Sequence, residues 1–523
     1  MKHLPAFPMT KAALAALLAA LVLAGCGGSD PDKMVASARD FLAKNDSKSA
    51  IIQLKNALQE KPENPEARFL LGQALIRTGD MAGAEAELRK ALALKHSPEA
   101  VVPLLVKALA GQGQFKKLTE EFGGTTLSNA ANQAELKVAL VAAYAALGKA
   151  SESQAALAAA LAADPNNPAA QLIQAREKAS KRDIDGALAM VDGILARAPG
   201  FEEAHRFRGD MLAYGKQDAA GAMAAYRKAV EVKPNYIEGH ASILTQLLRE
   251  RKFDDAAKQL DALRKVAPSV PTTFYFDAML AYQKRDIKTA KERSQQLMKL
   301  ASNSALALQL AGAIELEANS LVQAESYLAK SLQIAPDAVL TRRLLTTAYL
   351  RSGQPAKAMS TAQPFLKEAD KLDANLNALL GEVFLQSADP KRAEEFFARA
   401  SKLDPKNERT RTAMALTQVA GGRADAGMAE LQEISATESG TTATMALIST
   451  HLRRGELDKA LQAIDVLEKK QPDSPLAHNL RGRTLLAKKD VAGARKSFER
   501  SLQLDPAYFA SVASLAAMDM ADK

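Results

Sequence analysis

A period of about 34 residues runs through this 523-residue chain and restricts its possible folds more than any other feature. Pro165, Pro199, Pro234 and Pro268 follow one another at this spacing to within one residue, and later prolines fall at one or two periods. Self-similarity at such a period is typical of arrays in which one small unit stacks on the next. Each unit of an array contacts only its neighbours, so chain length says little about the number of domains.

Small residues recur at fixed places within each period. The separation of Gly72 from Ala84 is the same as that of Gly482 from Ala494. Small side chains let two helices cross closely, which indicates one helix pair per period. The repeats defined in this way start at residues 31, 65, 99, 134, 168, 202, 237, 271, 305, 339, 374, 408, 441 and 475. Alanine occupies the crossing position of the second helix in eleven of the fourteen: Ala50, Ala84, Ala187, Ala222, Ala256, Ala290, Ala324, Ala358, Ala393, Ala460 and Ala494.

This pattern resembles the tetratricopeptide repeat, a helix–turn–helix unit of the same period. The resemblance implies an all-α chain, a right-handed superhelical solenoid of about 14 repeats over residues 31–506, with about 28 helices and no sheet. The first helix of each pair (helix A) would line a concave groove, and the second (helix B) would lie outside it. Residues 507–523 are expected to form a terminal capping helix or the start of a further repeat.

Two repeats are irregular. Residues 99–133 carry Leu118 at the alanine position and a Gly123-Gly124 pair, and residues 408–440 carry three glycines and a Ser439-Gly440 pair. Each of these repeats is either a hinge of the array or tolerated sequence drift, and the sequence favours neither interpretation.

Residues 1–25 are typical of a secretory signal peptide. Lys2 and Lys11 make the start basic, and the apolar stretch from Ala12 to Ala24 is shorter than the roughly 20 residues of a membrane-spanning helix. The only cysteine, Cys26, follows directly and resembles the lipid-attachment cysteine of a bacterial lipobox. We therefore predict lipidation of Cys26, a tether over residues 26–30, and anchoring by several acyl chains. Gly27, in place of an aspartate retention signal, implies the periplasmic face of the outer membrane.

Composition and charge exclude several other classes of protein. The 47% hydrophobic content excludes a disordered chain, and a single cysteine excludes a disulfide scaffold. Removal of residues 1–25, which hold two lysines and no acid, leaves a formal net charge of +7 instead of +9. The basic residues are scattered among nearly as many acids, so we expect no nucleic-acid binding.

The motifs of catalysis are missing from the sequence. It contains no phosphate-binding glycine loop, no G-x-S-x-G and no H-E-x-x-H, so we expect neither an enzyme nor a cofactor. Glu202 and His205 have a spacing found in metal sites, but without further ligands they favour a helix surface. His205, His240 and His478 share one repeat position, which favours packing over metal binding.

The expected groove has one cluster of large side chains. In tetratricopeptide arrays, residues 2, 5, 9, 12 and 13 of helix A usually face the concave side. This frame places Tyr214, Arg249, Tyr275, Met279 and Tyr282 on the inner wall of three successive repeats. Such residue types dominate binding hot spots, and their rings could equally stack on sugars. The alternative is that they fill gaps between adjacent A helices.

A narrower resemblance suggests a biological role. The segment AIIQLKNALQEKPENPEARFLL (residues 50–71), with the degenerate repeat that follows it, is similar to the lipoproteins with tetratricopeptide repeats of exosortase/PEP-CTERM systems. That resemblance implies a non-catalytic periplasmic scaffold for exopolysaccharide biosynthesis and export and for the sorting of PEP-CTERM proteins. Its partners would be proteins or peptides, including the polysaccharide machinery. The alternative is a general outer-membrane assembly or pilotin-type lipoprotein.

Overall fold

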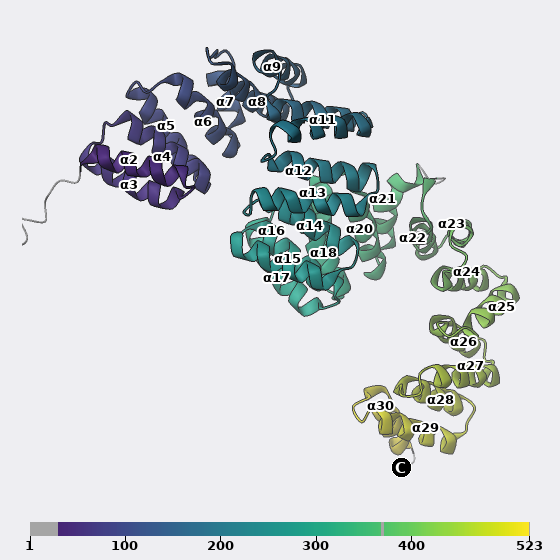
Figure 1. Ribbon diagram of the computed structural model, residues 1–523. Coiled ribbons are helices and arrows are strands. Elements are labelled where there is room, and N and C mark those ends of the chain that lie inside the picture. Colours follow the sequence, from purple (N-terminus) through teal and green to yellow (C-terminus); the bar gives the residue numbers. More distant parts are fainter. Residues whose placement is uncertain (1–29, 368–370, 522–523) are drawn as a thin grey trace, which may run out of the picture. The chain divides into compact units, whose positions relative to one another are not determined.

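The computed structural model describes residues 30–367 and 371–521, in which it contains 29 α-helices and no strand (Figure 1). The predicted all-α repeat fold is confirmed. Thirteen A–B helix pairs pack together, α14 and α15 lie at the division between the two units described next, and α30 (Phe509–Ala521) follows the last pair. The chain divides into an N-terminal unit that ends at Gln246 and a C-terminal unit that begins at Leu247, within α14.

The N-terminal unit contains six complete helix pairs and the first part of α14. One helix A is completed by a π-helical turn, η1. The elements are α2 (Pro31–Ala43), α3 (Ser47–Glu60), α4 (Pro65–Thr78), α5 (Met81–Ala93), α6 (Pro98–Gly111), α7 (Phe115–Phe122), α8 (Ala130–Ala146), α9 (Ala150–Ala163), α10 (Pro168–Ser180), α11 (Ile184–Arg197), α12 (Glu202–Asp210), η1 (Met211–Gly215), α13 (Ala219–Val232) and α14 (Ile237–Arg249).

The C-terminal unit contains the remaining pairs. Its helices are α15 (Phe253–Val266), α16 (Pro271–Gln283), α17 (Ile287–Leu300), α18 (Ala305–Glu317), α19 (Leu321–Ile334), α20 (Val339–Arg351), α21 (Pro355–Leu366), α22 (Ala374–Gln386), α23 (Pro390–Leu403), α24 (Glu408–Ala420), α25 (Ala424–Ser435), α26 (Thr441–Arg453), α27 (Leu457–Lys470), α28 (Pro475–Ala487), α29 (Val491–Leu504) and α30.

The small residue of helix A accommodates a large side chain of helix B. Gly381 lies against the buried ring of Phe397, and a Cβ atom at Gly381 would come within 2.6 Å of that ring. Gly482 and Phe498 repeat this arrangement. Because interiors are close-packed, these glycines leave the space that the aromatic rings fill. The core of each pair is therefore built at the crossing that the sequence period marks.

Each of the fourteen A–B turns contains one residue with positive φ, directly before the N-cap of helix B. Six of these residues are glycines, including Gly79 with φ 86°, where the left-handed conformation carries no Cβ penalty. Seven helices B then begin at an aspartate whose carboxylate accepts a hydrogen bond from the third backbone N–H of the helix. The turn and the cap together fix where each helix B starts.

The connection between repeats is held by the fourth residue of helix A. The ring nitrogen Nε2 of His205 lies 2.8 Å from the carbonyl oxygen of Pro199, and His240 makes the same contact with Pro234 at 2.9 Å. Gln171 donates to the carbonyl of Pro165 at 2.7 Å. In these repeats a polar side chain at this position satisfies the carbonyl of the loop proline. His478, at the same position, instead lies 3.3 Å from Glu468.

Four repeats depart from the regular arrangement of helices. In residues 99–133, helix α7 has only 8 residues. Residues 202–236 are one residue longer than the period, and the π-helical turn η1 accommodates this extra residue. In residues 339–373, seven residues separate α21 from α22. Residues 408–440 are one residue short of the period, and their helix α25 has 12 residues, whereas most B helices, such as α27, have 14 residues.

Candidate partner-binding surfaces

Most successive A helices contact one another within each unit, for example α16 with α18 and α18 with α20. No pair of successive B helices makes a comparable contact in the described part of the chain. Each unit therefore curves with its A helices on the inner side. We refer to the exposed side of α16, α18 and α20 as the A-helix wall.

The five predicted groove residues are divided between the two units. Tyr214 belongs to the N-terminal unit, whereas Arg249, Tyr275, Met279 and Tyr282 belong to the C-terminal unit. The structure brings together the three residues of α16, which pack as half-buried side chains against the core of Ala278, Ala290 and Leu297. Arg249 lies at the end of α14 and is exposed.

Tyr275 and Tyr282 both pack against the core and reach the surface. The ring of Tyr275 meets Phe276 edge-on, with centroids 5.3 Å apart. Burial raises the pKa of both tyrosines above the ordinary value. Tyr282 also borders a recess of about 310 Å³ with Phe253, Arg251 and Arg285. Each ring is thus partly in the core and partly at the surface, and both interpretations remain predictions.

Tyr214 has a different environment. It lies on the π-helical turn η1, and 63% of its surface is exposed, more than for any other tyrosine of the chain. π-Helical turns within α-helices are frequent at functional sites. The sequence frame placed Tyr214 on the inner wall without indicating this local geometry.

A polar network lies directly before η1. Asp210 accepts a hydrogen bond from the hydroxyl of Tyr226 at 2.9 Å and pairs with Arg206 at 2.9 Å. Arg206 also donates to the hydroxyl of Tyr236 at 3.1 Å. Burial raises the pKa of Asp210 above its ordinary value, although Arg206 and Tyr226 act in the opposite direction. The network fixes the side chains around the extra residue.

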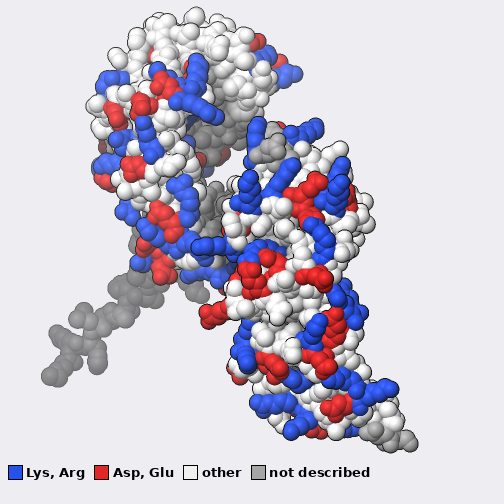
Figure 2. All heavy atoms as spheres, turned by 90° about the vertical axis from the view of Figure 1, so that its right-hand side faces the viewer, with Lys and Arg blue, Asp and Glu red and all other residues white. Residues whose placement is uncertain are grey.

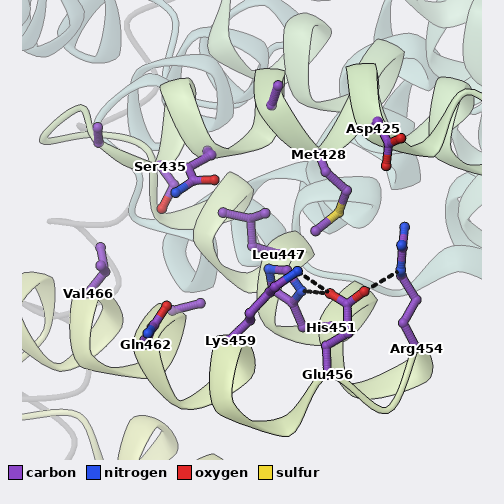
Figure 3. A pocket seen from close by; sticks show the side chains of 14 residues that line it. Asp425, Met428, Ser435, Leu447, His451, Arg454, Glu456, Lys459, Gln462 and Val466 are labelled. Atoms are coloured by element: carbon purple, nitrogen blue, oxygen red, sulfur yellow. Dashed lines mark hydrogen bonds and ion pairs between the residues drawn. The ribbon is translucent and has the colours of Figure 1, made fainter.

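A recess of about 600 Å³ in the C-terminal unit was not predicted from the sequence. Helix α25 forms one wall with Met428 and Asp425, and α27 forms the other with Lys459 and Gln462 (Figure 3). The recess adjoins the repeat that is one residue short, whose helix α25 ends at Ser435. The missing residue in the period was the signal that could have located it.

One end of this recess is charged. Glu456 accepts from Nδ1 of His451 at 2.7 Å and pairs with Arg454 at 2.9 Å and Lys459 at 3.4 Å (Figure 3). These groups, His451 first, hold the pKa of Glu456 below its ordinary range. Ser435, at the other end, shares a hydrogen bond of 2.8 Å with Thr444. The histidine is thus oriented by a carboxylate and packed between helices.

Charges of both signs alternate over the face shown in Figure 2. Several pairs join successive A helices, such as Arg39 with Glu66, and Arg176 with Glu203 at 3.5 Å. In the C-terminal unit Glu382 of α22 pairs with Arg409 of α24 in the opposite order, whereas Arg285 pairs with Glu317 in the same order. Exposed pairs of this kind contribute little to stability. They indicate instead how neighbouring repeats are aligned.

Neither a metal-binding group nor a membrane-spanning helix occurs among the described residues. No cluster of three or more His, Cys, Asp or Glu side chains could hold a metal ion there, and no helix is long and apolar enough to cross a bilayer. Cys26 and the predicted signal peptide lie outside the described residues, so their predictions stand untested.

Comparison with known proteins identifies the repeat. A family model described as tetratricopeptide repeat matches residues 35–98, 172–237, 344–408 and 445–509. Each match spans about two consecutive repeats of the sequence frame. The irregular repeats 99–133 and 408–440 lie almost entirely outside the matches. No curated protein matches the chain.

Two solved structures are similar in part. A chain from the crystal structure of the APC/C hetero-tetramer Cut9-Hcn1 shares 15% identity, with 95% of this chain and 97% of that chain covered and a TM-score of 0.44. A tetratricopeptide repeat protein from Parabacteroides merdae ATCC 43184 shares 16% identity, with 47% of this chain and 97% of that chain covered and a TM-score of 0.37.

Proposed function

Because the four matched segments belong to the tetratricopeptide repeat family, we propose that this chain is a non-catalytic scaffold that binds other proteins on its A-helix surfaces. One observation carries the proposal. On the A-helix wall, Tyr275 and Tyr282 of α16 lie partly in the core and partly at the surface, and Leu306 of α18 is exposed. A surface that is already ordered by packing loses little entropy when a partner covers it.

The proposed location is the periplasmic face of the outer membrane. The support is the sequence alone: an unbroken apolar stretch, Ala12 to Ala24, with the single cysteine, Cys26, directly after it. Lipid on Cys26 would hold the repeats close to the bilayer, because only four residues separate it from α2 at Pro31. Replacement by serine tests the anchor. We expect Cys26→Ser to move the protein from the membrane fraction to the soluble periplasm, and unchanged membrane binding would refute lipidation.

The proposed process is exopolysaccharide biosynthesis and export together with the sorting of PEP-CTERM proteins. It rests on the resemblance of residues 50–71 and of the degenerate repeat after them. Deletion of the gene should reduce secreted polysaccharide and leave a PEP-CTERM reporter protein missorted. Re-expression of the wild-type chain should restore both.

The alternative process is general outer-membrane assembly. In that case deletion would lower the levels of many outer-membrane proteins and leave polysaccharide secretion per cell unchanged. Quantification of outer-membrane proteins and of polysaccharide in the same deletion strain therefore separates the two processes. The scaffold function itself is common to both.

A further inference from the structure

Four B helices carry an aspartate as their second residue, and three of these aspartates pair with the residue that directly follows the next helix A. The three pairs are Asp185 of α11 with Lys216 at 2.5 Å, Asp254 of α15 with Lys284 at 3.9 Å, and Asp458 of α27 with Lys488. Each pair joins a helix B to the following repeat across the interface between them.

The fourth aspartate, Asp425 of α25, does not make such a pair. Arg454 follows the next helix A and so takes the place of the lysine, but its Nε donates to Glu456 at 2.9 Å instead. No hydrogen bond or ion pair joins Asp425 to the other residues that line the recess between α25 and α27 (Figure 3). Asp425 and Arg454 are therefore held apart at this interface.

A second bridge between repeats is also missing here. Where the fifth residue of a helix B is Glu or Lys, its side chain binds a polar group of the following repeat, as Glu85, Lys291, Glu325 and Glu394 do. In α25 this residue is Met428, which has no charge to offer. The interface after α25 thus lacks both bridges, and the recess of about 600 Å³ lies there.

The recess combines a charged end with an apolar interior. Met428, Leu447, Ala463 and Val466 supply apolar surface from all three helices around it. At the charged end, the guanidinium of Arg454 has five N–H donors, of which Nε–H binds Glu456. The terminal N–H groups can therefore donate to a second carboxylate.

The charges on the two walls select the kind of ligand. An anion could pair with Arg454 but would be repelled by Asp425 of the opposite wall, and a cation would meet the reverse problem. A molecule that carries both charges can satisfy both residues, and an apolar group on it can cover the interior. Pockets of about 300–1,000 Å³ are typical of small-molecule sites, and this recess lies within that range.

We propose that the recess binds a small zwitterion with an apolar side chain, either a free α-amino acid or a dipeptide. Its carboxylate accepts from Arg454, its ammonium group donates to Asp425, and its side chain lies against Met428 and Val466. The ligand replaces the direct pair that joins α11, α15 and α27 to their following repeats. This site goes beyond the scaffold function, because its walls are the B helices α25 and α27 and not the A-helix wall.

The test is isothermal titration calorimetry of the full-length chain with L-leucine and with L-leucyl-L-leucine. The chain is kept in lipid nanodiscs, so that no free detergent competes for the apolar interior. At least one ligand should bind with a dissociation constant below about 1 mM, and the tighter one identifies the source. Acetylation of its amino group, or amidation of its carboxyl group, should each weaken binding at least about tenfold. If neither ligand binds, or if the blocked forms bind equally well, the proposal is wrong.

Variants locate the site. Asp425→Asn and Arg454→Gln should each weaken binding about tenfold, and Ala429→Trp should prevent it, because Ala429 is exposed on α25 and lines the recess. Asp458→Asn is the matched control, since Asp458 has the same position in α27 but pairs with Lys488 outside the recess. Circular dichroism melting checks that each variant folds. If Ala429→Trp folds and binds as before, the recess is not the site.

Direct pairing of Asp425 with Arg454 in solution is the competing outcome. The recess would then be closed by the same kind of pair as at the other three aspartates. In that case neither ligand binds, and Asp425→Asn lowers the melting temperature as much as Asp458→Asn does. This result would overturn the ligand site but would leave the deletion phenotypes of the scaffold untouched, so the two proposals are tested independently.

Discussion

Repeats 99–133 and 202–236 of the N-terminal unit are both one residue longer than the regular period, but they absorb the extra residue in different ways. In residues 202–236 it widens helix A into η1, and both helices of the pair keep full length. In residues 99–133 helix B shrinks to α7, with 8 residues, and seven loop residues lead to α8. The same insertion is thus tolerated inside a helix in one repeat and outside the helices in the other.

The two repeats are stabilised by polar contacts of different origin. Residues 202–236 use a network of their own, in which Tyr226 lies over Gly209 and binds Asp210. Residues 99–133 depend on the preceding repeat. There Glu85 of α5 accepts from Gln112 at 2.9 Å and from Lys117 at 2.7 Å. The comparison indicates that an insertion needs compensating polar contacts. These contacts can come from the same repeat or from the preceding repeat.

The largest effect is expected at the internal network. Tyr226 is 2% exposed, and its replacement by alanine would leave a cavity over Gly209 and an Asp210 carboxylate with one partner fewer. We expect Tyr226→Ala to lower the free energy of unfolding by about 3–5 kcal/mol and Tyr226→Phe by about 1–3 kcal/mol. Urea unfolding measures the total loss of stability. Hydrogen exchange shows which helices lose protection, because repeat arrays can unfold in parts.

If the phenylalanine variant is as destabilised as the alanine variant, the hydroxyl dominates and packing over Gly209 is secondary. If neither variant changes hydrogen exchange in α12 and α13, the internal network does not stabilise this repeat.

A somewhat smaller effect is expected for the contacts of Glu85 with residues 99–133. Burial alone would raise the pKa of Glu85, but hydrogen bonds from Lys117, Arg89 and Gln112 lower it to about 2. Relative to the ordinary value of 4.5, the full shift would correspond to roughly 3 kcal/mol near neutral pH, and solvent screening of the partly exposed Lys117 and Arg89 lowers this contribution. We expect Glu85→Gln to lose most of it, with increased hydrogen exchange in α6 and α7.

The pH dependence separates the two networks. Because the pKa of Glu85 is lowered by folding, its contribution is present above pH 4.5 and is lost as the pH falls toward 2. The pKa of Asp210 is raised by burial, so its contribution is present below the ordinary pKa of 3.8 and is lost as the pH rises through the folded-state value. Acidification from pH 5 to pH 3 should therefore loosen α6 and α7 before α12 and α13. The reverse order in hydrogen exchange would contradict this assignment.

Most of the fold could be predicted because the period itself encodes it. In twelve of the fourteen repeats, the predicted start is the first residue of helix A; the third and fourth repeats instead begin helix A at Pro98 and Ala130. The crossing residues, such as Gly381 and Ala393, are buried as their size required. A long series of matching positions averages out local ambiguity, so single substitutions do not obscure the frame.

The irregularities could not be derived in the same way. A lengthened repeat shows that one residue is extra, but helix propensity does not decide between η1 and a longer loop, since the outcome depends on tertiary contacts such as that of Tyr226 with Asp210. For the same reason the recess at His451 was missed. The predicted groove residues Tyr275, Met279 and Tyr282 lie together on α16, yet their ligand is a matter for experiment.

The smallest effect is expected when the extra residue is removed. Deletion of Ala213 from η1 returns the repeat to the regular length and puts Gln217 and Asp218 at the turn and cap positions of the other repeats. Gly209 and Asp210 precede the deletion and keep their places, and the lost side chain is only a methyl group. We expect a change in the free energy of unfolding within about 1 kcal/mol, since a π-helical turn is less favourable than α-helix.

The matched control is deletion of Ala281 from α16, which lies in a repeat of regular length. There every residue after the deletion turns by about 100° around the helix and the A–B turn loses its register, so a loss of about 4 kcal/mol or more is expected. Both variants are compared by urea unfolding and by hydrogen exchange in the altered helix. If the deletion in η1 is as damaging as the one in α16, the inserted residue is structural. If it is tolerated, the π-helical turn persists for another reason, and the exposed Tyr214 that it carries becomes the first residue to test for partner binding.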